Sequence, residues 1–146
     1  MQIIETISGH LTKGETRDIH KVALGWEDRT KSRQKVKTEQ GEEFAIALST
    51  GQTLNIGDIL LEDKGRVVVI DSIKEDVLVV YASSPEEMAK IAFQIGNRHA
   101  PIQIEKDRIL TPYDRLMEDF LKKQHFHCEV AVETFTHDFS TYHHHS

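Results

Sequence analysis

Apolar and polar side chains alternate along the first half of the chain with the two-residue period of β-strands. Larger apolar residues occupy every second position over residues 22–26 and 44–48, and residues 67–70 form a continuous apolar run. Gln40-Gly41 and Lys64-Gly65 fall where hairpin turns would join such strands. Because no helical period competes with this pattern, it predicts a small β-sandwich or barrel of antiparallel strands.

The character of the sequence changes at the charged segment Lys74-Glu75-Asp76. We take this segment as the boundary between a β-rich first domain, residues 1–74, and a second domain, residues 75–146. Residues 77–81 then form a continuous apolar run that is short enough for a buried strand.

A helix is predicted directly after this strand. Ser84 provides an N-cap, Pro85 suits the first helical position, and Glu87 completes a capping box. Apolar residues follow at one-face spacing over residues 88–95, and Gly96-Asn97 provides a stop. His99 is therefore expected just beyond the C-terminus of a helix.

The remaining pattern completes a β-α-β-β-α-β order. Residues 102–105 and 108–110 predict a hairpin, and Thr111-Pro112 is interpreted as the cap and start of a second helix with an apolar stripe. Phe126, Cys128, Val130 and Val132 alternate with polar or small residues, which predicts a half-buried final strand. The fold class is thus α+β, with a ferredoxin-like second domain and a histidine-containing tail.

Composition excludes several classes of protein. The formal net charge is -6 over 146 residues, so no basic excess is present to neutralise a nucleic-acid backbone. Because apolar residues never run to a membrane-spanning length, no membrane segment is expected. The single cysteine, Cys128, cannot form an internal disulfide, and a cytoplasmic location is expected.

Histidine is the unusual residue, with nine copies, of which five lie in the last 20 residues. Imidazole binds nickel, copper and zinc, so this composition raises metal binding as a hypothesis. His99 would lie at the negative pole of a helix dipole, which favours a cation. Since no second ligand stands three or four residues away, a twofold axis that pairs two copies of His99 would complete a site, assisted by the tail histidines His143, His144 and His145.

Two segments resemble a known family. Gly96-Asn97-Arg98-His99 is similar to the G-N-R-H segment of the UreE urease accessory proteins, and Gly57-Asp58-Ile59-Leu60 is similar to their G-D-[IV]-L segment. The resemblance implies a homodimeric metallochaperone that binds Ni(II) as cargo at the paired His99. It also implies delivery to the urease maturation complex through the accessory GTPase, UreG, and a docking role for the first domain.

Alternative interpretations stay open. Spacing alone favours a helix-capping role for His99, and the family resemblance reverses this preference. His125, His127 and His137 are weaker metal candidates. The run of three histidines also resembles a purification tag. Zn(II) and Cu(II) suit the same ligands as Ni(II).

At the level of function, two other classes compete with a nickel chaperone. One is a protein-binding module that binds no metal, and the other is a general buffer for copper, zinc or nickel. No nucleophile elbow, phosphate-binding glycine loop or zinc-protease motif occurs in the sequence, so an enzyme is not expected.

Overall fold

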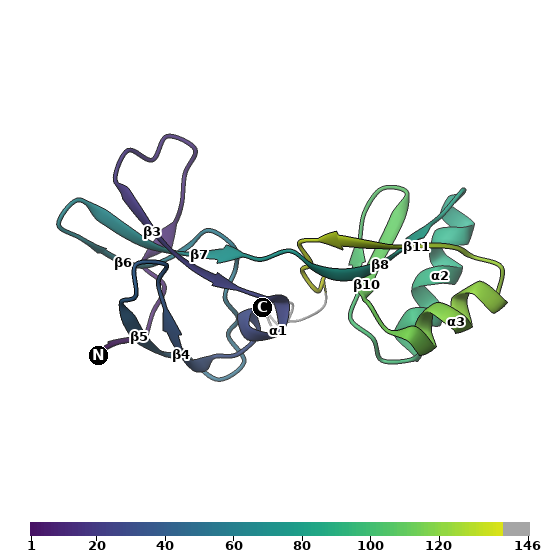
Figure 1. Cartoon of the computed structure of the whole chain (residues 1–146), viewed down its shortest axis with the longest axis horizontal. Coiled ribbons are helices and arrows are strands. Elements are labelled where there is room, and N and C mark those ends of the chain that lie inside the picture. Colours follow the sequence, from purple (N-terminus) through teal and green to yellow (C-terminus); the bar gives the residue numbers. More distant parts are fainter. Residues whose placement is uncertain (139–146) are drawn as a thin grey trace. The chain divides into compact units, whose positions relative to one another are not determined.

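A computed structural model describes residues 1–138 of the chain, which fold as two compact units rich in β-sheet (Figure 1). The first unit comprises Met1–Ile73, and the second begins at Lys74. Each unit has its own hydrophobic core, and each is described by itself.

The first unit contains two sheets and one short helix. One sheet has the strand order β1-β5-β4, and the other has the order β2-β6-β7-β3. The bounds are β1 Gln2–Ile4, β2 Gly9–His10, β3 Asp18–Leu24, α1 Trp26–Arg29, β4 Arg33–Lys37, β5 Glu43–Ala47, β6 Asp58–Asp63 and β7 Arg66–Ser72. Buried side chains from both sheets form one core, among them Val22, Phe44, Ile46, Leu60 and Ile70.

Two features of this unit differ from the sequence prediction. β1 pairs with β5, and β3 pairs with β7, in parallel rather than antiparallel fashion. Alternation of apolar and polar side chains indicates a strand, but it does not show whether two neighbouring strands run parallel or antiparallel. The sequence pattern therefore could not reveal the two parallel pairings. The helix α1 was also not predicted, because four residues are too few to establish a helical period.

The second unit has the ferredoxin-like plan that the sequence predicts. Its four strands follow the order β11-β8-β10-β9, with all neighbouring strands antiparallel. The bounds are β8 Glu75–Tyr81, α2 Pro85–Asn97, β9 Gln103–Ile104, β10 Arg108–Pro112, α3 Arg115–Lys123 and β11 His127–Glu133. Residues from both helices and the sheet share one core, including Leu78, Val80, Ile91, Ile109 and Leu121.

The start of the second helix was predicted wrongly. Thr111 and Pro112 belong to strand β10, and Asp114 is the N-cap of α3, its carboxylate accepting a hydrogen bond from the Met117 amide at 2.8 Å. Thr111 is buried, and its hydroxyl donates to the carbonyl of Pro101 at 2.8 Å. Strand pairing with β8 therefore outweighs the local cap-and-proline signal at this position.

The final strand also differs from its prediction. Val130 and Val132 of β11 were assigned to a buried face, yet they are 53% and 58% exposed. Phe126 and Cys128 do pack against the core, as predicted. Because β11 is an edge strand and α3 is only nine residues long, the covered part of this face ends before Val130.

Candidate metal centre

His99 occupies a special position in the motif that ends helix α2. The backbone amide of His99 donates to the Gly96 carbonyl at 2.9 Å, and the amide of Ala100 donates to the Ile95 carbonyl at 3.4 Å. These two bonds define a Schellman motif, in which the residue after the cap adopts a left-handed conformation. That residue is His99, with φ of 61°. The helix ends at Asn97, as the Gly96-Asn97 stop predicts, but the left-handed position that follows the cap belongs to His99 rather than to a glycine.

Glycine is the usual residue at such a position, because an L-side chain there is sterically strained. A histidine at φ 61° therefore reduces stability relative to glycine. Lys64 and His125 also adopt positive φ, so the backbone conformation is compatible with a functional role for His99 but does not single it out. The imidazole is exposed at the negative pole of the α2 dipole, where a bound cation is stabilised.

The surroundings of His99 are partly apolar and exposed. The guanidinium of Arg98 lies 3.4 Å from the centroid of the Phe120 ring, which links the end of α2 to α3. Phe93 on α2 is 67% exposed and Leu116 on α3 is 77% exposed. Exposed apolar side chains indicate a surface that contacts another protein where they form a contiguous patch.

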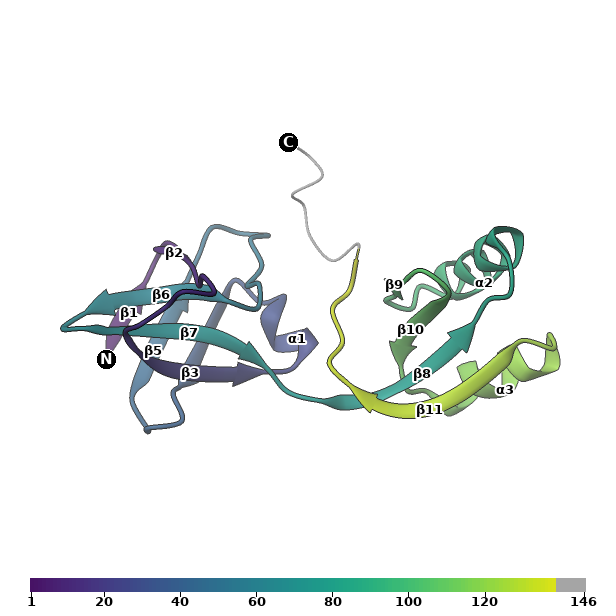
Figure 2. The same ribbon diagram turned by 90° about the horizontal axis from the view of Figure 1, so that it is seen from above.

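His137 lies in the segment that follows β11 and returns to the edge of the sheet at β9 (Figure 2). The backbone amide of Ile102 donates to Nδ1 of His137 at 3.2 Å. Metal binding through that nitrogen would break this contact. The next residue, Asp138, donates its amide to the Ile102 carbonyl at 2.8 Å and accepts from the Ile104 amide at 2.6 Å.

The other weaker candidates lie on two different elements. His125 follows the cap of α3 in a second Schellman motif, with φ of 67°. His127 begins β11, where its ring lies 5.1 Å from that of Tyr81 and its Nε2 lies 3.3 Å from a Glu129 carboxylate oxygen. Strand β11 therefore carries His127 but not His125.

Within residues 1–138, no three or more histidine, cysteine, aspartate or glutamate side chains are grouped closely enough to hold a metal ion. Cys128 is a poor additional ligand. Partial burial raises the pKa of its thiol and so disfavours the thiolate form that binds metals. The tail histidines His143, His144 and His145 lie outside the described residues. A site at His99 thus needs ligands from beyond this part of one chain.

The glycine of the first-domain motif has a steric role. Gly57 adopts φ of +93°, and a Cβ there would lie 2.7 Å from Cε1 of His10. Asp58 is nearly buried, and its carboxylate accepts from the Asn55 amide at 2.7 Å. Both motif residues therefore hold the shape of their loop. A shallow hollow beside it is lined by apolar residues that include Leu11, Ile19, Ile56 and Val69.

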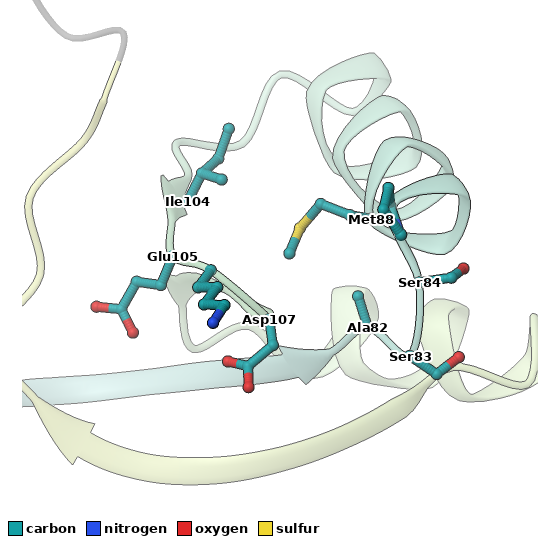
Figure 3. A pocket seen from close by; sticks show the side chains of 9 residues that line it. Ala82, Ser83, Ser84, Met88, Ile104, Glu105 and Asp107 are labelled. Atoms are coloured by element: carbon teal, nitrogen blue, oxygen red, sulfur yellow. The ribbon is translucent and has the colours of Figure 1, made fainter.

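A larger groove of about 470 Å³ lies in the second unit, between the start of α2 and the β9–β10 hairpin. Figure 3 shows Met88 pointing from the helix toward the hairpin, which carries Ile104. Its lining residues include neither histidine nor cysteine, and it lies at the opposite end of α2 from His99. The groove is therefore separate from the candidate metal centre.

Comparison with known proteins covers both units. Residues 2–71 match the model of the UreE urease accessory protein N-terminal domain, and residues 75–146 match that of the C-terminal domain. A urease accessory protein UreE from Staphylococcus carnosus is 40% identical over 124 residues, which span 82% of this chain and 83% of the relative. The chain belongs to the UreE family of urease accessory proteins.

Other UreE proteins support the same assignment. The relative from Bacillus sp. (strain TB-90) is 37% identical over 83% of each chain, and that from Bacillus cereus is 39% identical over 74% of this chain and 72% of the relative. The family resemblance inferred from the G-N-R-H and G-D-[IV]-L segments is thereby confirmed. In residues 1–138 of this UreE family member, no helix has both the length and the apolar character needed to cross a membrane.

Sequence reasoning named His99 as a candidate but missed how the segment after β11 of this UreE protein is attached. Phe135 is fully buried, and residues 136–138 make hydrogen bonds to residues 102–104. No local pattern signals these contacts, since their partners lie more than 30 positions away. The run of polar residues that looks like the start of a tail is in part a fixed element of the fold.

Proposed function

We propose that this protein is a cytoplasmic nickel metallochaperone for urease maturation, a carrier rather than a catalyst. In this proposal two copies of His99 meet across the axis of a homodimer and hold one Ni(II) between them. His143, His144 and His145 add further ligands. The proposal rests above all on the match of residues 75–146 to the UreE C-terminal domain, together with the exposed position of His99 at the negative end of α2.

The need for a second chain follows from the coordination chemistry. A single imidazole does not hold a metal ion tightly, and residues 1–138 offer no group of three ligands. An isologous interface brings two copies of a residue together whenever the twofold axis passes beside it. Phe93 lies on α2, six positions before His99, and an interface that extends from His99 along this helix would cover its exposed ring.

Delivery of the metal requires ligands that release the ion readily to the next protein. Nitrogen ligands from two chains and a terminal tail suit nickel or copper better than a closed thiolate site does. In the proposed pathway the urease accessory GTPase UreG receives the ion within the maturation complex. We place docking of that partner on the first domain, in the region around Gly57. Zn(II) and Cu(II) would compete for the same ligands.

Nickel titration calorimetry tests the proposal. The wild-type chain should bind about one tight ion per dimer, and His99→Ala should lose that site. A chain that ends before Tyr142 should keep the tight site and lose weaker ones. A tight site that survives His99→Ala would contradict the role of His99. Absence of binding at micromolar nickel would favour a protein-binding module.

A further inference from the structure

The side chain that directly precedes His99 lies on an aromatic ring of the neighbouring helix. The guanidinium carbon of Arg98 is 3.4 Å from the centroid of the Phe120 ring, which is a contact distance for a cation over an aromatic face. Phe120 is itself partly buried and packs against the core of the second unit. The ring is therefore a fixed surface, and the contact joins the end of α2 to α3.

This contact is what fixes the Arg98 side chain. Three other arginines, Arg17, Arg66 and Arg108, each form ion pairs with two carboxylates. Within residues 1–138, Arg98 forms no ion pair with a carboxylate, although it is exposed. A guanidinium that is always charged and has no acidic partner is thus held by an aromatic face alone.

The backbone next to Arg98 gains from such a restraint. Arg98 is the C-cap residue of α2, and a single peptide bond joins it to His99, whose left-handed conformation is strained. Of the two hydrogen bonds that close the Schellman motif, the bond from the His99 amide to Gly96 is 2.9 Å long, but that from the Ala100 amide to Ile95 is 3.4 Å and weak. A contact that fixes the cap residue therefore opposes relaxation of the loop.

We propose that Arg98 is a positioning residue: its contact with Phe120 holds the His99 backbone in its left-handed conformation and so preorganises the imidazole for the metal ion. This inference rests on the proposed function. A ligand that is already held in its binding conformation loses less conformational freedom when the ion binds, and the affinity is correspondingly higher.

Amide hydrogen exchange tests the positioning without metal. The amides of His99 and Ala100 donate the two hydrogen bonds of the motif, so their exchange rates report how often it opens. Phe120→Leu removes the aromatic face but keeps an apolar side chain. It should speed exchange at both amides by about twofold to fivefold, the effect of losing an exposed cation–π contact. Phe120→Tyr keeps the face and should exchange like wild type.

An Arg98→Leu background separates the contact from a role of Phe120 in the core alone. If the ring acts through Arg98, Phe120→Leu should cause no further change in exchange in this background. Leu116→Ala is the matched control, since Leu116 lies one turn earlier on α3 and is 77% exposed, and it should leave exchange unchanged. Equal acceleration by Phe120→Leu in both backgrounds, or none in the wild-type background, would overturn the inference.

Nickel titration of the same variants connects the backbone to the metal. Phe120→Leu should weaken the tight site by about twofold to fivefold, and Phe120→Tyr should bind like wild type. If Phe120→Leu leaves nickel affinity unchanged while His99→Ala loses the tight site, the inference is wrong and the proposed function stands. If His99→Ala binds nickel normally, the proposed function fails and the inference fails with it.

Discussion

His99 and His125 occupy equivalent positions at the ends of two different helices. Each follows the cap residue in a Schellman motif, and each has a left-handed backbone, with φ of 61° and 67°. Both therefore bear the same steric strain, and glycine would relieve it at either site. The two histidines form a matched pair in which only one is assigned the tight metal site.

Glycine substitution at these two positions should separate stability from metal binding. We expect His99→Gly and His125→Gly each to raise the free energy of unfolding by about 1 kcal/mol, because left-handed strain is removed. Only His99→Gly should lose the tight nickel site. Urea unfolding and nickel titration of both variants check this. If only His125→Gly lost the tight site, the metal centre would lie at His125, at the other end of the second unit, and not at His99.

The proposed dimer surface makes a separate prediction about exposed apolar residues. Phe93→Asp should raise the dimer dissociation constant at least tenfold, roughly the effect of losing 1.4 kcal/mol of interface free energy. Val132→Asp replaces a similarly exposed residue on β11 and should leave the dimer intact. Sedimentation equilibrium measures both. Dissociation caused by Val132→Asp but not by Phe93→Asp would place the interface on the sheet edge.

Acid should destabilise the second unit through Glu133. The Arg108 guanidinium donates hydrogen bonds to both Glu133 carboxylate oxygens, at 2.9 and 2.8 Å, and holds the pKa of that carboxyl below its ordinary value of 4.5. A lowered pKa in the folded state stabilises the protein above the ordinary value, and that stabilisation is lost as pH falls through the folded value. The free energy of unfolding should therefore decrease from about pH 4.5 downward.

The variant Glu133→Gln tests the origin of this acid sensitivity. It should be less stable than wild type at pH 7, and its stability should decrease less between pH 4.5 and pH 3, because one of the carboxylates responsible is gone. Urea unfolding at these pH values measures the difference. Identical slopes for the variant and wild type would show that Glu133 contributes nothing to the pH dependence.

The corrected start of α3 is also testable. Asp114→Ala should reduce the free energy of unfolding by about 1 kcal/mol, because the Met117 amide loses its capping acceptor. Asp119→Ala, on the same helix and exposed, should change stability by less than about 0.5 kcal/mol. Equal effects would argue that Asp114 is not the cap.

Local signals in the sequence predicted the fold well where nothing competed with them. Ser84 caps α2 as predicted, its hydroxyl accepting from the Glu87 amide at 3.0 Å. Thr111-Pro112 carried the same signal but lies in β10, where Pro112 extends beyond the two residues that pair with β9 and so needs no amide donor on that side. Tertiary pairing, which a local pattern does not contain, decided between helix and strand.

The candidate site was predictable in part for the same reason. Composition and a short motif indicated His99, since both are properties of the sequence alone. The left-handed backbone of His99 belongs to a local Schellman motif that a histidine does not signal, and the hydrogen bond from the Ile104 amide to Asp138 forms only when distant segments meet. Sequence patterns therefore named a candidate ligand, whereas the attachment of residues 136–138 to residues 102–104 was found only in the structure.

Mixed dimers test most directly whether two chains share one ion through His99. Wild-type and His99→Ala chains, unfolded together in equal amounts and refolded, should assort at random. If both copies of His99 are required, the mixture should hold about one quarter of the tight nickel sites of wild type. A capacity of about one half, proportional to the wild-type chains present, would mean that each chain binds its ion alone.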